Sequence, residues 1–103
     1  MNKKEAKLVI LKELDHYRSM SFSELRELLE RVDAYGVTSP GGIDYQIEVH
    51  AIWDDKPEDN IRVFGEISDR GFLSSFLPLC ESFIMSPDGE LVDESKAWPF
   101  NEG

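Results

Sequence analysis

The N-terminal third of the chain carries apolar residues at helical spacing, three or four positions apart. In residues 3–18 the apolar stripe consists of Ala6, Val9, Ile10, Leu14 and Tyr17. In residues 21–35 it consists of Phe22, Leu25, Leu28, Leu29 and Val32. Asn2 and Ser21 stand where capping side chains are expected. We therefore predict two consecutive helices, the second of which ends near Tyr35 with Gly36 as its C-terminal cap.

The hydrophobic period changes to two after a loop predicted for residues 37–42. Residues 43–53 alternate apolar and polar side chains, as do residues 61–68, and the polar residues 54–60 connect them. This pattern predicts two antiparallel strands joined as a hairpin. Further along, residues 72–77 predict a short helix, and residues 82–85 and 90–92 predict two more strands around the turn at residues 86–89.

The predicted order of elements is helix, helix, strand, strand, short helix, strand, strand. This order is typical of an α+β fold in which the two N-terminal helices pack on one face of a small, mostly antiparallel sheet. The other face of that sheet is then polar. We expect one domain over residues 1–92, followed by a flexible acidic tail over residues 93–103.

Part of the strand region is similar to a known family. The segments are Tyr45-Gln46-Ile47-Glu48-Val49 with the hairpin that follows, Glu81-Ser82-Phe83-Ile84, and Pro87-Asp88-Gly89. Together they resemble a family of small uncharacterised bacterial α+β domains, over residues 42–92. That family has no assigned activity. The resemblance implies the order of elements and a bacterial origin, and it transfers no functional residue.

The distribution of charge adds a constraint on possible partners. Residues 1–35 carry seven basic and seven acidic side chains, whereas residues 36–103 carry four basic and fourteen acidic ones. The whole formal charge of −10 therefore lies in the second part of the chain. Such a charge disfavours binding to nucleic acid or to an anionic membrane and favours a basic protein partner. Charge of this kind also serves solubility alone.

Other features of the sequence bear on the cell compartment. The longest aliphatic run covers residues 8–11, which is far too short for a membrane span. The chain carries one cysteine, and we find no export signal in its first residues. These observations predict a cytoplasmic protein.

The histidine and cysteine side chains, which are the candidate zinc ligands, lie far apart in the sequence. His16, His50 and Cys80 show no zinc-binding spacing, so neither a metal nor another cofactor is expected. Cys80 is predicted to be a small buried side chain. The acidic side chains within residues 54–60 provide the type of oxygen ligand that calcium prefers, but they lack the spacing of a calcium-binding loop.

Two surfaces are candidate functional sites. The first is a protein-binding surface at Trp53, Asp54, Asp55, Glu58 and Asp59, although Trp53 equally suits the end of the core stripe. The second is the polar strand face with Asp44, Glu48, His50 and Arg62. There, Glu48 and His50 point the same way for acid/base work, and Glu48 pairs with Arg62 if the strand register permits. An ordinary solvated sheet face explains the same pattern.

The leading functional hypothesis is a non-enzymatic acidic protein-binding module, similar to an inhibitor or immunity protein, that engages a basic protein partner. The alternative is a small-molecule binding or enzymatic site on the polar sheet face around Glu48 and His50. For the oligomeric state we expect a monomer or a weak homodimer.

Overall fold

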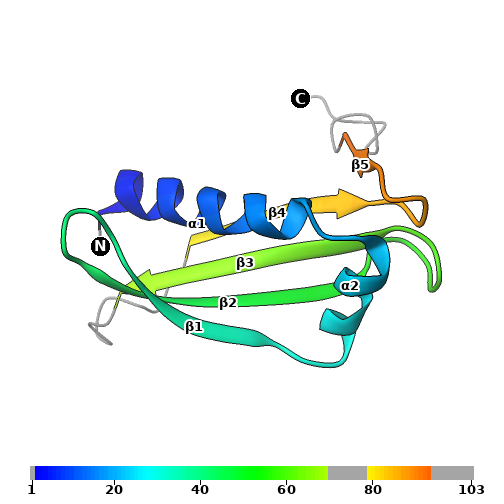
Figure 1. The fold of residues 1–103 in the computed structure, drawn as a ribbon, viewed down its shortest axis with the longest axis horizontal. Helices are drawn as coiled ribbons and strands as arrows, with labels where there is room; N and C mark the ends of the chain where they lie inside the picture. Colours follow the sequence, from blue (N-terminus) through cyan, green and yellow to red (C-terminus); the bar gives the residue numbers. More distant parts are fainter. Residues whose placement is uncertain (1, 70–78, 94–103) are drawn as a thin grey trace.

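The computed structural model describes residues 2–69 and 79–93. Helices α1 (Lys3–Arg18) and α2 (Phe22–Arg26) and the 3₁₀ helix η1 (Glu27–Leu29) precede the strands. The strands are β1 (Asp33–Thr38), β2 (Asp44–Trp53), β3 (Ile61–Asp69), β4 (Leu79–Met85) and β5 (Leu91–Val92). They form one antiparallel sheet in the order β1-β2-β3-β4-β5 (Figure 1). The predicted α+β class is confirmed.

Helix α1 buries the apolar stripe that its sequence predicts. The Asn2 side chain accepts a hydrogen bond from the Glu5 backbone N–H at 3.1 Å and so caps the first turn. The five residues of the predicted stripe are the buried residues of this helix. They form one core with inward-facing strand residues, among them Tyr45, Ile47, Val49, Ala51, Ile61, Val63, Ile67, Phe83 and Met85.

Helix α1 lies across β3 and β4, and Gly65 of β3 permits a close approach. A Cβ atom at Gly65 would lie 2.8 Å from Ile10 Cδ1 and 3.2 Å from Leu14 Cδ2. Both distances are shorter than an ordinary contact, so a side chain here would displace the helix or its core residues. The missing side chain therefore sets how closely the helix approaches the sheet.

The second predicted helix is shorter than expected. Its capping box is present, because Ser21 and Glu24 exchange hydrogen bonds between side chain and backbone. The helix nevertheless ends at Arg26, η1 ends at Leu29, and residues 33–38 pair with β2 as β1. The predictions of a helix to Tyr35, of Gly36 as its cap and of a loop starting at residue 37 were wrong.

Pairing with β2 explains this correction. In β1, Tyr35 and Val37 face the core side, while Ala34 and Gly36 are exposed, which is the alternation of a strand. The Tyr35 hydroxyl also donates a hydrogen bond to Glu13 of α1 at 2.8 Å. Tertiary contacts have overridden the helical spacing that ends with Val32, which is 49% exposed.

Strand β4 begins earlier than the predicted strand at residues 82–85. Its alternation places Leu79 against the core and leaves Cys80 exposed, so the prediction of a buried Cys80 was wrong. The predicted short helix at residues 72–77 and nearly all of the predicted tail lie outside the described residues.

Three tyrosines link the elements on the core side to carboxylates. Their hydroxyls donate hydrogen bonds of 2.8 Å: Tyr17 to Asp33, Tyr35 to Glu13, and Tyr45 to Glu5. Burial, reinforced by the carboxylate acceptor, raises the pKa of Tyr17 and of Tyr45 to about 12 and also raises the pKa of Tyr35. These carboxylates thus have donors supplied by the fold itself.

Candidate functional site

The face of the sheet turned away from α1 carries most of the polar strand residues. We call this surface the outer face and define it by Glu48, His50 and Ile52 of β2 with Phe64 and Glu66 of β3. The β2–β3 register places Glu48 directly opposite Glu66 and His50 directly opposite Phe64. Side chains of directly opposed residues lie on the same face and contact one another.

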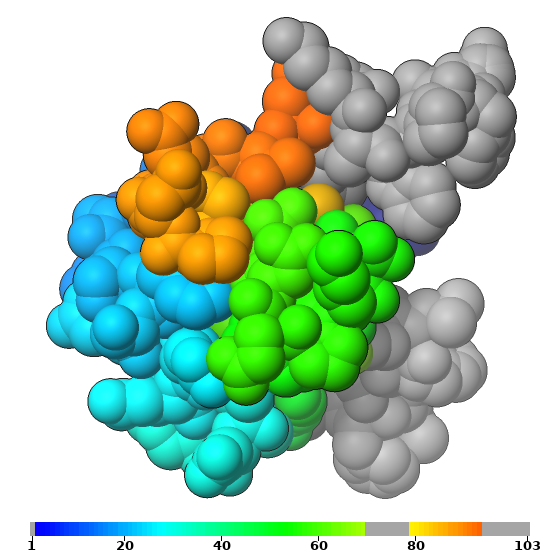
Figure 2. All heavy atoms as spheres, turned by 90° about the vertical axis from the view of Figure 1, so that its right-hand side faces the viewer, coloured from blue at the N-terminus to red at the C-terminus, as the bar shows by residue number. Residues whose placement is uncertain are grey.

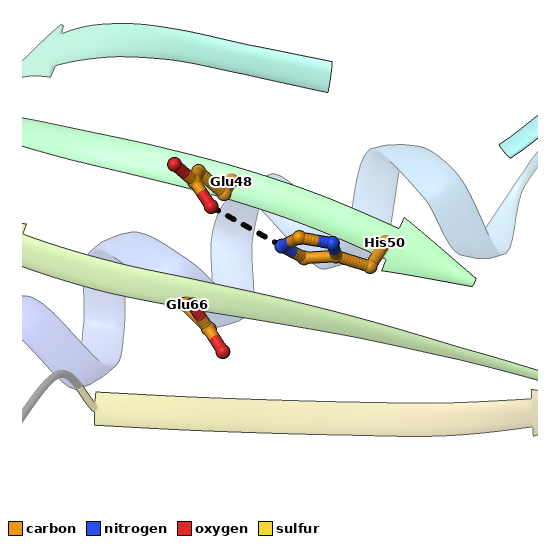
Figure 3. A group of neighbouring side chains, drawn as sticks. All are labelled: Glu48, His50 and Glu66. Atoms are coloured by element: carbon orange, nitrogen blue, oxygen red, sulfur yellow. Dashed lines mark hydrogen bonds and ion pairs between the residues drawn. The ribbon is translucent and has the colours of Figure 1, made fainter. Parts of the chain in front are cut away.

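Glu48, His50 and Glu66 form one cluster at the centre of the outer face (Figure 3). The His50 Nε2 atom lies 3.3 Å from Glu48 Oε1. One carboxylate oxygen of each glutamate and one ring nitrogen of His50 all lie within 4.8 Å of one another. In residues 2–69 and 79–93, no other group of three histidine, cysteine or acidic side chains meets in this way.

The imidazole ring of His50 is held by an aromatic neighbour. Its plane stacks on the ring of Phe64 with a centroid distance of 4.9 Å and an angle of 8° between the planes. Such stacking limits rotation of the ring and keeps Nε2 near Glu48. A groove of about 340 Å³ begins beside these rings and is lined by His50, Ile52 and Phe64 with residues 28–32 and Ala51.

Of the four residues predicted for a polar-face site, the structure brings only Glu48 and His50 together. Arg62 is opposite Ile52 in the register, so the proposed pairing with Glu48 does not occur. Arg62 instead donates to Asp54 at 3.1 Å and to Ser82 at 3.0 Å. Asp44 lies at the other end of β2, where it accepts a hydrogen bond from Thr38 at 2.7 Å.

Glu66 is the residue that the sequence prediction left out of the site. It lies on the predicted polar side of its strand, but only the strand register places it beside Glu48 and His50. A signal was present in the sequence, because Trp53 and Ile61 are the apolar residues that bound the polar connection. Pairing them closes the hairpin and puts residue 48 opposite residue 66.

Cys80 continues the same row of side chains across the sheet. It lies opposite Glu66 on β4 and is exposed. Loss of part of its hydration raises the pKa of the Cys80 thiol, and the negative charges of Glu66 and Glu81 raise it further. The thiol is therefore held in its protonated form at neutral pH, which lowers its reactivity.

The acidic loop at residues 54–60 packs beside α2 at one end of the molecule. Figure 2 shows this end, with the loop in green beside the cyan of the α2 region. Trp53, at the start of the loop, contacts the ring of Phe22 in a tilted arrangement, with 6.4 Å between the ring centres and 37° between the planes, and the Arg26 guanidinium lies 5.2 Å from the Trp53 ring centre. Trp53 is thus half-buried, in contact with Phe22 and Arg26.

Two of the four predicted acidic residues in this loop have arginine partners. Arg26 pairs with Glu58 at 3.1 Å, and Arg62 pairs with Asp54 at 3.1 Å. For Asp55 and Asp59 the described part of the chain contains no ion pair. Glu58 has a φ of 66°, a left-handed conformation that is uncommon for a residue with a side chain and fits a tight turn.

Comparisons with known proteins do not extend this description. No family model, no curated protein and no solved structure matches the chain. The resemblance to a bacterial family therefore stays a prediction. Among the described residues, no helix has the length and apolar character needed to cross a membrane.

Proposed function

We propose that the protein is a non-enzymatic acidic protein-binding module, similar to an inhibitor or immunity protein, that engages a basic protein partner. The observation that carries this proposal is the opposition of Glu48 and Glu66 on the outer face. Like charges directly opposite one another on neighbouring strands destabilise a sheet. A lysine or arginine from a partner, placed between these carboxylates, would turn this repulsion into attraction.

The outer face also offers the apolar contacts that a stable interface needs. Ile52 is 49% exposed, and the half-buried Phe64, which lies opposite His50, lines the same groove. Interfaces are stabilised mainly by a few desolvated apolar or aromatic residues, whereas charged residues at the rim steer association. An apolar strip beside two acidic residues supports both roles on one surface.

The loop at residues 54–60 is the other part of the proposed surface. Trp53, Asp54, Asp55, Glu58 and Asp59 stay our predicted partner-binding residues there, and the loop directly continues β2 and β3. Because Arg26 and Arg62 already compensate Glu58 and Asp54, we expect the loop to contribute less than the outer face. Asp55 and Asp59 are the loop residues most available to a basic partner.

The proposal is tested by capture of partners from lysate on three baits. These are the wild-type protein, Glu48→Gln with Glu66→Gln, and Asp55→Asn with Asp59→Asn. Both variants remove two negative charges, so they separate the position of the charge from its amount. We expect one basic protein to bind the wild type and the loop variant but not the outer-face variant.

The purified pair should then show electrostatic binding. The affinity should fall steeply as the salt concentration rises from about 50 to about 300 mM, because salt screens exposed charges. Failure to capture any basic protein, or an affinity that does not change with salt, would contradict the proposal. Equal loss of binding in both variants would show that binding depends on the net charge of the protein and not on the outer face.

A second candidate function is a small-molecule binding or enzymatic site around Glu48 and His50. It is favoured by the 3.3 Å approach of these two side chains beside the 340 Å³ groove, which has the size of a small-ligand site. A metabolite library screened by thermal shift tests it. A hit that stabilises the wild type but not His50→Gln would support this candidate, and hits that stabilise both equally would exclude it.

A further inference from the structure

The cluster of Glu48, His50 and Glu66 combines two carboxylates with one imidazole, whose nitrogen binds metal ions when the ring is neutral. Among their direct strand neighbours, Glu48 lies opposite Ala34 and Glu66, and Glu66 lies opposite Glu48 and Cys80. None of these neighbours in the described sheet is a lysine or an arginine. Arg62, the nearest basic residue along β3, is hydrogen-bonded to Asp54 and Ser82. Within the described residues, the two carboxylates therefore have no lysine or arginine directly opposite them.

The positions of the ligand atoms suit a metal ion. Three atoms that are no more than 4.8 Å apart leave a central point within about 2.8 Å of each of them. Bonds from zinc to nitrogen or carboxylate oxygen measure about 2.0–2.2 Å. Each ligand atom would need to move by only about 1 Å, which a rotation of a glutamate side chain at the protein surface supplies.

We propose that Glu48, His50 and Glu66 bind a divalent first-row transition-metal ion, with Zn²⁺ as the representative ion. Imidazole nitrogen favours such ions over Mg²⁺ and Ca²⁺, which prefer oxygen ligands alone. Three protein ligands leave at least one coordination position for water or an external ligand. This position faces away from α1, since all three side chains lie on the outer face.

The stacking of His50 on Phe64 supports the proposed site. A metal-binding imidazole needs its ring held in one orientation by neighbouring groups. Here the nearly parallel contact with Phe64, at 4.9 Å between ring centres, restrains the ring while Nε2 points to Glu48 (Figure 3). The site thus has a prearranged nitrogen ligand and two movable carboxylates.

This inference does not rest on the proposed function, because it concerns the isolated protein and needs no partner. It also departs from the expectation that no metal binds. That expectation relied on ligand spacing along one segment, whereas Glu66 comes from the neighbouring strand. A bound cation and a basic partner would compete for the same carboxylates, so the metal would weaken partner binding if both proposals hold.

The test is calorimetric titration of the full-length protein with Zn²⁺ in a non-chelating buffer at neutral pH. We expect one ion per chain, with weaker binding of Mg²⁺ and Ca²⁺ at the same concentrations. His50→Gln and Glu66→Gln should each lower the Zn²⁺ affinity about tenfold or more, since even outer-shell changes commonly cost 10- to 100-fold.

Four matched controls separate this site from other ligands. His16→Gln removes the other histidine, Cys80→Ser removes the thiol, and Glu90→Gln removes an exposed carboxylate elsewhere. The loop variant Asp55→Asn with Asp59→Asn removes two of the four acidic loop side chains. All four should bind Zn²⁺ as the wild type does. The proposal is overturned if wild-type protein binds no Zn²⁺, if a control loses binding as strongly as His50→Gln, or if His50→Gln and Glu66→Gln bind normally.

Discussion

Carboxylates on the two sides of the sheet have different surroundings, although they belong to the same residue types. Between α1 and the sheet, Glu5, Glu13 and Asp33 each accept a hydrogen bond from a tyrosine hydroxyl at 2.8 Å. On the outer face, Glu48 and Glu66 oppose each other, and His50 lies within 4.8 Å of both. The first set is satisfied by the fold, whereas the second set is arranged to bind a cation.

This difference indicates which acidic residues serve stability and which serve binding. A carboxylate with a fixed donor gains little from a ligand, and removal of its donor destabilises the protein. A carboxylate opposite another carboxylate lowers stability and gains from any cation that approaches. The presence of acidic residues therefore does not identify a binding surface. What identifies it is whether each carboxylate already has a hydrogen-bond donor within the fold.

High pH should have the largest effect on the side of the sheet that carries the tyrosines. Since folding favours the neutral phenols and raises the pKa of Tyr17 and of Tyr45 to about 12, their contribution is complete below pH 10, the ordinary value. It is lost as the pH rises from about 10 to about 12. Ionisation of either phenol therefore lowers the free energy of unfolding, and the two losses add.

The measurement is a titration followed by near-ultraviolet absorbance and circular dichroism. The three tyrosines of the chain all belong to this set, so tyrosinate should form together with unfolding. Tyrosinate absorbance that rises well before the circular dichroism changes would show that the phenols ionise freely in the folded protein.

Two isoleucines of β2 compare the faces directly. Ile47 is 1% exposed on the core side, and Ile52 is 49% exposed on the outer face. Ile47→Ala should lower the free energy of unfolding by about 2–5 kcal/mol, because it leaves a cavity in the core. Ile52→Ala should change it by less than about 0.5 kcal/mol. Urea denaturation measures both, and similar losses for the two variants would contradict the assignment of the faces.

Removal of one tyrosine hydroxyl should have a smaller effect. Tyr45→Phe keeps the buried ring but removes the donor to Glu5, so the free energy of unfolding should fall by about 1–2 kcal/mol. Glu5→Gln keeps an oxygen acceptor and should cost less. If both variants unfold at the wild-type urea concentration, the hydrogen bond contributes nothing measurable to stability.

The elements with strong local patterns were predictable from the sequence. The stripe of α1, the cap at Asn2, the capping box at Ser21 and the β2–β3 hairpin all follow from residues close together in the chain. Strand β1 was not predictable in this way. Its residues 33–38 come directly after a run of apolar residues at helical spacing, which favours continuing the helix through them. Only pairing with β2 gives them an extended conformation.

The candidate site was predictable in part for the same reason. Glu48 and His50 are two positions apart on one strand, so their proximity follows from the strand period. The third member, Glu66, depends on the register of the hairpin, as does the separation of Arg62 from Glu48. A register differing by two residues would have changed which charges meet, which is why the sequence alone left the Glu48–Arg62 pairing open.

The smallest expected effect concerns the cluster itself. If Glu48 and Glu66 repel each other, Glu66→Gln should raise the free energy of unfolding by about 0.2–1 kcal/mol in the absence of metal. Glu90→Gln, which removes an exposed carboxylate outside the cluster, should change it less. With saturating Zn²⁺ the wild type should gain about 1.4 kcal/mol more stability than Glu66→Gln for each tenfold difference in affinity, which exceeds the repulsion, so that the order of the two proteins reverses.

Thermal unfolding of wild type, Glu66→Gln and Glu90→Gln, each with and without Zn²⁺, therefore distinguishes a cation site on the outer face from an ordinary polar sheet surface. We expect Glu66→Gln to melt above the wild type without metal and below it with Zn²⁺, while Glu90→Gln follows the wild type in both conditions. If Glu66→Gln melts below the wild type without metal, and Zn²⁺ shifts all three proteins equally, the outer-face carboxylates are not arranged to bind a cation.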